Sequence, residues 1–533
     1  MKKILKLFII SAFSFVILSN CARRGRPEGG PKDEASPVMT IAKPAHLTTN
    51  FKADEIKIYF DEYIKLKDIQ KQLIVSPPLK YPPVIAPLGT PSKFISIQIL
   101  DTLKENTTYT FNFGESVIDN TEGNILQNFK YVFSTGDVID SLKVSGTIKD
   151  AFDKEADKNV TVMLYEINES FTDSTIYKDK PYYVASTLDT TAWEITNMKS
   201  GKYLMMALND VAKNYKFNPK QDKIGYIKEY ISIPTDTSYL INLFKEELPF
   251  KLKKPSEVGK GLLFFGYEGT ADSLKVKPLD TSDDFIYFSH FQKDKDSLNF
   301  WYKNNVKDSI QFNIFNKEYR DTVTVKLRSK KVDTIVIKGS VRGGTLHLRE
   351  NFKLKSNIPI ESIDTSKIRF IDADSINVAH TFKISIEKNE IELNFIKKYN
   401  QRYNLQLFPE AITDFFGNVN DSLRYNLSTK KPTDYGNLYL TLQNIKSYPV
   451  IVQLITDKSA LVEEIYANKA QEYIFTNLVP GKYLVRIIYD ENQNSKWDTG
   501  NYLLKKQPEE VIYFDNILDV RANWVLTETF ILK

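Results

Sequence analysis

The residues with the clearest potential for chemistry lie in one loop near the end of the chain. In the stretch YDENQNSKWD, Asp490, Asn492, Asn494 and Asp498 alternate with other residues. Read as a calcium loop of the EF-hand type, they fall at positions 1, 3, 5 and 9, and the Lys496 carbonyl falls at position 7. Carboxylate, amide and carbonyl oxygens are the ligands that calcium takes. The spacing therefore makes this loop a candidate calcium site.

The same loop departs from the calcium pattern in two places. Ser495 stands where the turn glycine belongs, and Asn501 replaces the bidentate glutamate of the last position. Asp and Asn side chains also bond their own backbone and hold long loops without a metal. The loop is therefore either a calcium site or a structural loop, and the sequence favours the structural loop.

A shift of 280 residues aligns this region with an earlier one. Residues 476–498 and 196–218 align without a gap, and nine of the 23 positions are identical. At the ligand positions the earlier loop has Asp210, Ala212, Asn214 and Asn218. One ligand is missing there and one carboxylate has become an amide. The repeat indicates duplication, with any calcium binding confined to the second copy.

Residues that commonly carry out catalysis are scattered. The four histidines are His46, His290, His347 and His380. None of them has another histidine or a cysteine at ligand spacing, and the sequence contains no HExxH, GxSxG, phosphate-binding or dinucleotide-binding motif. We predict that the protein is not an enzyme. A hydrolase with a carboxylate pair drawn from distant strands stays an alternative, because sequence spacing would not reveal such a pair.

Aromatic residues leave a third alternative open. Trp193, Trp301, Trp497 and Trp524, together with many tyrosines, could stack on sugar rings. In β-proteins such side chains more often pack in the core or across strands. A carbohydrate-binding or adhesive role is therefore the second functional hypothesis.

The elements that must position these residues are β-strands. Ile56, Ile58 and Phe60 alternate with polar residues, and the segments YTFNF and IELNF follow the same rule. A period of two is typical of half-buried strands, and no segment sustains a helical period. The sequence predicts an all-β chain of tandem antiparallel β-sandwiches, each of about 100 residues.

The two aligned regions carry a shared Gly-Lys-Tyr motif between strands, at 201–203 and 481–483. This pattern resembles the transthyretin-like modules of the carboxypeptidase-regulatory and collagen-adhesin B type. The resemblance implies small open β-sandwiches at 138–245 and 431–533. The glycine is expected to permit a tight turn, and the tyrosine is expected to pack back on the sandwich.

A second kind of module precedes each of these. Residues 37–137 contain FDEYI, an L-x-x-N-T-x-Y step, a D-x-x-x-G-N turn and a closing FSTG. This set resembles the bacterial Ig-like domain named for the S-layer protein SbsA. Residues 346–430 resemble a degenerate second copy. Its turn residues Asp414, Gly417 and Asn418 correspond to Asp119, Gly123 and Asn124. Residues 246–345 are expected to form another sandwich, of no assigned family.

The chain begins with a secretory pattern. Three lysines precede an apolar run that ends before Cys21, the single cysteine of the chain, which predicts a signal peptide at 1–20. The stretch LSNC resembles a bacterial lipobox, which implies that Cys21 is lipidated. Residues 21–36 are rich in Gly, Pro and charge and are expected to form a flexible tether. The predicted attachment to the membrane is therefore through lipid.

The net charge of the chain limits the classes of partner that we expect. Removal of the signal peptide takes away three lysines and no acidic residue, so the net charge falls from +5 to +2. This value lacks the basic field of a nucleic-acid-binding protein. The sequence thus predicts an outer-membrane lipoprotein, on the cell surface or the periplasmic face. Its expected role is a non-catalytic binding or scaffolding spacer for envelope or outer-membrane proteins, with no cofactor except possible calcium.

Overall fold

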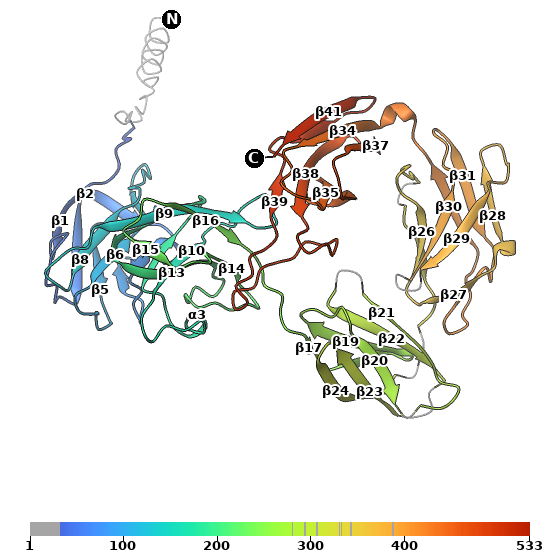
Figure 1. Cartoon of the computed structure of the whole chain (residues 1–533), viewed down its shortest axis with the longest axis horizontal. Helices are drawn as coiled ribbons and strands as arrows, with labels where there is room; N and C mark the ends of the chain where they lie inside the picture. Colours follow the sequence, from blue (N-terminus) through green and yellow to red (C-terminus); the bar gives the residue numbers. More distant parts are fainter. Residues whose placement is uncertain are drawn as a thin grey trace, which may run out of the picture.

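The computed structural model describes residues 32–279, 281–292, 295–304, 308–329, 331, 333–341, 344–385 and 389–532. The predicted signal peptide, Cys21 and most of the predicted tether lie outside these residues. The described chain forms five β-sandwiches that follow one another along the sequence (Figure 1). The predicted all-β fold of tandem β-sandwiches is confirmed. In the part of the chain that the structure describes, the helical elements are single turns: α2 (Ile69–Gln72), α3 (Thr175–Lys178), η1 (Thr365–Lys367) and η3 (Pro432–Asp434). Across the described residues, no helix has the length and apolar character needed to cross a membrane.

Sandwich 1 shows why the alternating sequence forms strands. Ile56, Ile58 and Phe60 in β2 are all buried, because every second residue of a strand faces the same side. One sheet has the order β1-β2-β5-β4 with β7 beside β2, and the other has the order β3-β6-β8. The strands are β1 (Met39–Lys43), β2 (Glu55–Leu66), β3 (Ile74–Ser76), β4 (Val84–Ala86), β5 (Ser92–Gln98), β6 (Thr108–Asn112), β7 (Val117–Asp119) and β8 (Lys130–Ser134).

Sandwiches 2 and 5 have the same topology. Each places a three-stranded sheet, β12-β9-β16 or β37-β34-β41, against a larger sheet, β11-β10-β13-β14 or β36-β35-β38-β39. In these three-stranded sheets β16 pairs in parallel with β9, and β41 pairs in parallel with β34. This pairing departs from the purely antiparallel pairing that the sequence predicted. Sandwich 2 comprises β9 (Leu142–Asp150), β10 (Thr161–Glu166), β11 (Tyr183–Ser186), β12 (Ala192–Met198), β13 (Gly201–Asn209), β14 (Lys223–Tyr226), β15 (Ile231–Ile233) and β16 (Ser238–Leu243). Sandwich 5 comprises β34 (Gly436–Gln443), β35 (Val450–Thr456), β36 (Leu461–Ala467), β37 (Glu472–Leu478), β38 (Gly481–Tyr489), β39 (Val511–Tyr513), β40 (Leu518–Val520) and β41 (Val525–Ile531).

Sandwiches 3 and 4 lie between these two copies. Sandwich 3 comprises β17 (Lys251–Leu252), β18 (Ser256–Gly259), β19 (Leu262–Glu268), β20 (Lys275–Leu279), β21 (Ile286–Phe291), β22 (Ser297–Lys303), β23 (Ser309–Asn316) and β24 (Tyr319–Lys326). Sandwich 4 comprises β25 (Ile337–Gly339), β26 (Phe352–Ser356), β27 (Ile360–Ile363), β28 (Ile368–Asp372), β29 (His380–Ser385), β30 (Glu390–Phe395), β31 (Arg402–Leu407), β32 (Ile412–Asp414) and β33 (Leu423–Ser428). Each encloses its own apolar core.

Sandwiches 1 and 4 share two local devices. The carboxylate of Asp119 accepts the backbone N–H five residues on at 2.7 Å, and that of Asp414 accepts the N–H four residues on at 2.8 Å. The glycine in each turn has a positive φ, 81° and 84°, which favours glycine. The hydroxyls of Tyr109 and Tyr403 each accept the N–H of the residue five positions earlier, both at 2.9 Å. Sandwiches 1 and 4 therefore have the same kind of Asp-to-Gly turn and the same tyrosine contact.

The Gly-Lys-Tyr motif works differently from the expectation. Neither Gly201 nor Gly481 forms a tight turn, since each begins a strand, and the positive φ falls instead at Asn197 and Asn477. A Cβ on Gly201 would lie 3.2 Å from the Tyr203 hydroxyl, so the missing side chain leaves room for that ring. The prediction of a tight turn at this glycine was therefore wrong: the missing side chain of Gly201 leaves room for the Tyr203 ring, whereas a Cβ on Gly481 would lie at an ordinary 3.9 Å from the Tyr483 ring.

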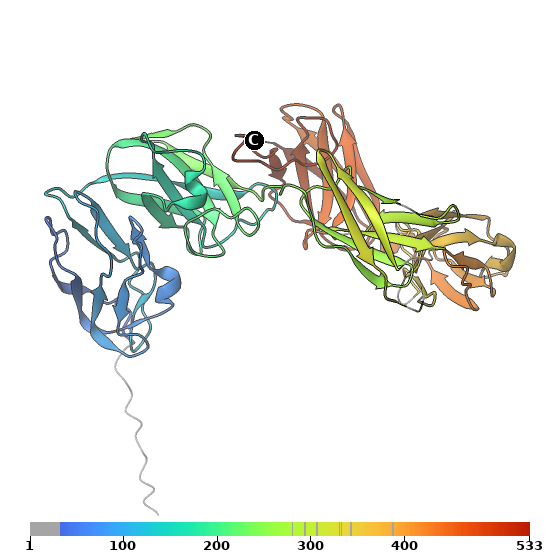
Figure 2. The ribbon, with the colours of Figure 1, turned by 90° about the horizontal axis from the view of Figure 1, so that it is seen from below.

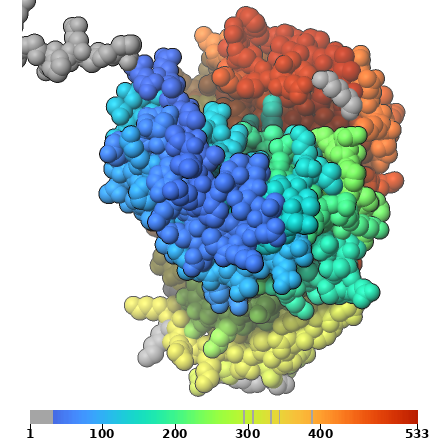
Figure 3. Space-filling model, turned by 90° about the vertical axis from the view of Figure 1, so that its left-hand side faces the viewer, coloured from blue at the N-terminus to red at the C-terminus, as the bar shows by residue number. Residues whose placement is uncertain are grey.

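The chain returns on itself. Trp497 and Tyr502 of sandwich 5 pack against the core of sandwich 2. An ion pair between Lys220 and Glu268 joins sandwiches 2 and 3. The Lys303 side chain donates to the Phe415 carbonyl and joins sandwiches 3 and 4. The Arg349 side chain donates to the Thr476 carbonyl and joins sandwiches 4 and 5. Sandwiches 2 to 5 therefore form a closed ring of contacts, here called the four-sandwich ring. Sandwich 1 lies beside sandwich 2 at one end of the molecule (Figures 1 and 2). From that end, sandwich 5 lies above it and sandwich 3 below it (Figure 3).

Candidate functional site

The two Asx-rich loops follow the same central strand of sandwiches 2 and 5. Strand β13 leads to Asp210 and β38 leads to Asp490, and both side chains are buried. Asp490 accepts the N–H groups of Asn494 at 3.1 Å and Ser495 at 2.8 Å. Asp210 accepts the N–H of Tyr215 at 2.7 Å. The first carboxylate of each motif therefore folds its own loop, as Asx residues do.

A second carboxylate closes each loop, and sequence reasoning missed both. Glu509 accepts the N–H groups of Glu491 and Asp498, each at 2.9 Å. Asp222 accepts the N–H groups at the equivalent positions of the first loop, at 3.1 and 2.8 Å. The fixed shift of 280 residues hid this match, because the stretch from Asp490 to Glu509 is seven residues longer than its twin.

The predicted calcium ligands satisfy one another. Asn492 and Asn494 donate their side-chain amide N–H groups to Asp498 Oδ2, the second at 3.1 Å. Lys506 Nζ lies 3.5 Å from the same oxygen, and the Lys496 N–H donates to Asn494 Oδ1 at 2.8 Å. In the parts of the chain that the structure describes, no group of three or more His, Cys, Asp or Glu side chains is arranged to hold a metal ion. Calcium binding by these residues stays a prediction.

The longer loop extends from sandwich 5 into sandwich 2. Tyr502 is fully buried there, with its ring 5.3 Å from that of Tyr226 in an edge-to-face contact. Its N–H donates to Glu246 Oε1 at 2.5 Å, and its hydroxyl bonds Asp173 Oδ1 at 3.1 Å. Residues 490–509 are called the latch below.

The latch also makes a close backbone approach. The Thr499 hydroxyl donates to the Lys245 carbonyl at 2.7 Å. A Cβ on Gly500 would lie 2.6 Å from Phe244 Cζ, closer than van der Waals contact allows. A glycine at this position therefore permits the loop to reach the core of sandwich 2.

Aromatic and cationic contacts support the base of the latch. The Trp497 ring lies 4.7 Å from that of Phe152, and the Arg486 guanidinium lies 4.0 Å from the Phe152 ring centre. The Tyr513 hydroxyl donates to the Phe152 carbonyl at 2.9 Å. Trp497 Nε1 donates to the Glu509 carbonyl at 3.0 Å, which links this contact to the second carboxylate. The aromatic residue that the repeat preserved is thus a packing anchor.

Burial shifts the pKa values of two groups where the latch meets sandwich 2. Burial raises the pKa of Glu246, and the hydrogen bond from the Tyr502 N–H partly opposes this shift. Lys505 Nζ lies 2.6 Å from Asp173 Oδ1 and 3.9 Å from the Tyr502 ring centre. Burial and the nearby Asp173 carboxylate raise the pKa of the Tyr502 hydroxyl. The contact therefore combines a neutral phenol with a partly buried ion pair.

The carboxylates with raised pKa values bear on the hydrolase alternative. Burial raises the pKa of Asp210, Glu246 and Glu509. Each of them accepts backbone N–H groups of a loop or the latch. Such carboxylates hold the backbone, which is a structural use of acidic groups.

The structure separates the other candidate residues. The histidines lie in three sandwiches: His46 in sandwich 1, His290 in sandwich 3, and His347 and His380 in sandwich 4. Trp193 and Trp301 are buried, as core packing predicts. Trp524 is 55% exposed, with the Arg521 guanidinium 5.0 Å from its ring centre.

Comparison with known proteins identifies one module. Residues 33–135, which contain the strands of sandwich 1, match the bacterial Ig-like domain family. No curated protein matches the sequence. Among solved structures, domains 1–6 of the surface layer protein SbsC are 12% identical, with 88% of this chain and 67% of that chain covered and a TM-score of 0.14. The major pilin subunit BcpA of Bacillus cereus is 9% identical, with 73% and 99% covered and a TM-score of 0.14. At these values the similarity says nothing about what this chain binds.

Proposed function

We propose that this protein is a non-catalytic, lipid-anchored protein of the cell envelope that acts as a binding or scaffolding spacer, accessory to an outer-membrane protein complex. The mature chain would begin at lipidated Cys21 and continue through the tether at 21–36. The proposed domains are 37–137 and 346–430 (Ig-like), 138–245 and 431–533 (transthyretin-like), and 246–345 (a further sandwich).

The latch is the observation that carries this proposal. The latch residues with the clearest potential for chemistry hydrogen-bond to one another, and the latch also hydrogen-bonds to the region of sandwich 2. These residues therefore join modules. A chain joined in this way presents its surfaces at fixed relative positions. Preorganised surfaces lose less conformational entropy when a partner binds, which suits a scaffold.

The order of the tether and the sandwiches also sets how far the ring would lie from the membrane. The proposed anchor leads into sandwich 1, and sandwich 1 leads into the four-sandwich ring. A flexible tether of this length spans about 20–25 Å on average. The ring would therefore be held off the membrane by the tether and one sandwich.

Affinity purification from mildly solubilised membranes tests the proposal. We expect an envelope or outer-membrane protein to co-purify in stoichiometric amount. A matched sample carrying Cys21→Ser is expected to leave the membrane fraction, because the lipid attachment would be lost. Recovery of the protein without a partner would contradict the scaffolding role. A Cys21→Ser variant that stays in the membrane fraction would contradict the lipid anchor. Protease treatment of whole cells distinguishes the cell surface from the periplasmic face.

Trp524 favours a second candidate function, binding of carbohydrate. Its exposed ring beside Arg521 has the features of a sugar-stacking surface. A glycan array with the full chain and a Trp524→Ala variant tests this function. Binding that the variant loses would favour the carbohydrate function, and the absence of any bound glycan would exclude it for the sugars on the array.

A further inference from the structure

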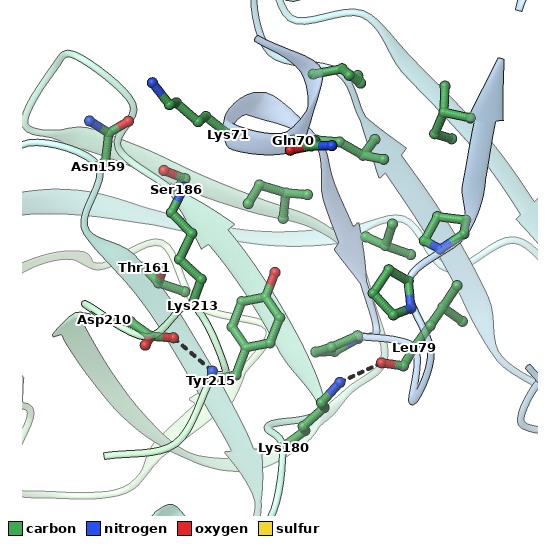
Figure 4. A pocket seen from close by; sticks show the side chains of 18 of the residues that line it. Gln70, Lys71, Leu79, Asn159, Thr161, Lys180, Ser186, Asp210, Lys213 and Tyr215 are labelled. Atoms are coloured by element: carbon green, nitrogen blue, oxygen red, sulfur yellow. Dashed lines mark hydrogen bonds between the residues drawn. The ribbon is translucent and has the colours of Figure 1, made fainter. Parts of the chain in front are cut away.

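A cleft of about 590 Å³ lies between sandwiches 1 and 2 (Figure 4). Its volume falls within the roughly 300–1,000 Å³ typical of small-molecule sites. Sandwich 1 contributes residues from the stretch 69–88, and sandwich 2 contributes residues of β10, β11 and the loop that begins at Asp210. No residue of the latch lines the cleft.

The two walls of the cleft differ in chemistry. The wall from sandwich 1 is apolar apart from Gln70 and Lys71. Its apolar side chains include Ile69, Leu73, Pro82, Pro83, Val84 and Leu88. Val84 and Leu88 are more than half exposed to solvent, so apolar surface is available within the cleft. The facing wall from sandwich 2 carries Asn159, Thr161, Lys180, Ser186, Lys213 and Tyr215.

The accessible charge of the cleft is positive. The Lys71 and Lys213 side chains are exposed, and neither makes an ion pair or hydrogen bond with the described residues. Asp210 also lines the cleft, but its carboxylate is buried and accepts the Tyr215 N–H, and no ion pair joins it to Lys71 or Lys213. In Figure 4 the side chains of Lys71, Asn159, Ser186 and Lys213 gather on one side of the cleft. One side therefore offers cations and polar groups, and the other offers apolar surface.

The walls are held together before any ligand binds. Lys180 Nζ of sandwich 2 donates to the Leu79 carbonyl of sandwich 1 at 2.6 Å. The Val184 N–H donates to Ser76 Oγ at 3.1 Å. These contacts cross the junction, so the cleft is preformed and a ligand would not have to order it.

We propose that this cleft binds a small amphipathic anion, whose apolar chain lies against sandwich 1 and whose acidic head lies beside Lys71 and Lys213. The apolar wall removes hydrocarbon from water, and the unpaired lysines supply charge complementarity. An amphipathic cation would meet like charge at the same place.

The twin loop provides an internal comparison. Gln493 occupies the position of Lys213 in the latch, and the latch packs on sandwich 2. Lys213→Gln therefore gives the first loop the residue of its twin. The substitution removes the cation while keeping an exposed polar side chain, so folding should be unaffected.

Calorimetric titration of the full chain with decanoate tests the proposal. Decylamine serves as the matched cation with the same chain, and acetate serves as the head group without the chain. We expect decanoate to bind at least tenfold more tightly than decylamine, and acetate to give no measurable binding. Lys213→Gln combined with Lys71→Gln should weaken decanoate binding about tenfold, whereas Lys228→Gln, an exposed lysine away from the cleft, should not change it.

A second variant tests the apolar wall. Val84→Glu places a negative charge on an exposed position of that wall and should abolish decanoate binding without lowering the melting temperature. Equal affinity for decanoate and decylamine, or equal effects of the cleft and control lysines, would overturn the proposal. Binding to vesicles that contain anionic lipid, without binding of decanoate, would also overturn it, because the lysines would then contact a membrane surface.

Discussion

The loops of sandwiches 2 and 5 begin alike and end in different places. Each is folded by a first carboxylate and closed by a second, Asp210 with Asp222 and Asp490 with Glu509. The first loop lines the cleft beside sandwich 1, and the second enters the core of sandwich 2. The two loops therefore share the hydrogen bonds of their two carboxylates and differ in the residues between them.

The difference lies in the seven extra residues of the latch. They carry Tyr502, which inserts between Asp173 of sandwich 2 and Glu246, a residue that follows the last strand of that sandwich. One insertion thus turns a surface loop into a contact between modules that are far apart in sequence. Duplicated sandwiches need little further change to close a chain on itself.

The largest effect is expected from loss of the inserted ring. Tyr502→Ala removes a fully buried aromatic side chain and should lower the free energy of unfolding by about 3 kcal/mol or more, measured by chemical denaturation. Leu504→Ala, at a 77% exposed position of the same segment, should stay within about 0.5 kcal/mol. Equal small losses in the two variants would show that the latch is not packed as described.

The next effect compares the two closing carboxylates. Asp222→Ala and Glu509→Ala each remove the acceptor of two backbone N–H groups and should cost about 1–3 kcal/mol of unfolding free energy. Hydrogen exchange should become faster at those amides in each variant. Glu509→Gln keeps only one of the two acceptor oxygens and should cost less than Glu509→Ala. Unchanged exchange in either alanine variant would break the equivalence of the two loops.

The sequence predicted the strands, the repeat and the Asx-rich character of both loops, because alternation and turn chemistry are local. It did not reveal the role of Glu509, since that residue acts across an insertion. Nor did it predict the burial of Tyr502, because a docking contact depends on another module more than 250 residues away. The expectation of a spacer also did not include the return of sandwich 5 to sandwich 2. Long-range contacts of this kind leave no period in the sequence.

A smaller effect follows from the pKa of Glu246. Burial raises this pKa above its usual 4.5, so the folded chain binds a proton more tightly than the unfolded chain. The stability that the protonated form provides is complete below about pH 4.5 and is lost as the pH rises through the raised pKa. Glu246→Gln should therefore match the natural chain at pH 4 and exceed its stability at pH 7. Denaturation at the two pH values measures the difference, and a Gln variant that is less stable at pH 7 would contradict this sign.

The smallest effect concerns calcium. The carboxylates of the latch are satisfied by its own N–H groups, so a chelator should leave the melting temperature of the full chain unchanged. Asp498→Asn provides the matched comparison, because it gives the position the residue of the first loop. A chelator that lowers the melting temperature of the natural chain, and not that of the variant, would favour the calcium site at 490–498.

The central claim is that the latch joins sandwich 5 to sandwich 2 in solution. Lys505 Nζ and Asp173 Oδ1 lie 2.6 Å apart, which is close enough for a carbodiimide to couple them directly. We predict that treatment of the dilute full chain yields an amide link between Lys505 and Asp173 within one molecule, identified by mass spectrometry. Lys505→Arg should abolish that link while leaving links elsewhere. The absence of the Lys505–Asp173 link, where other ion pairs of the chain are coupled, would contradict the closed arrangement.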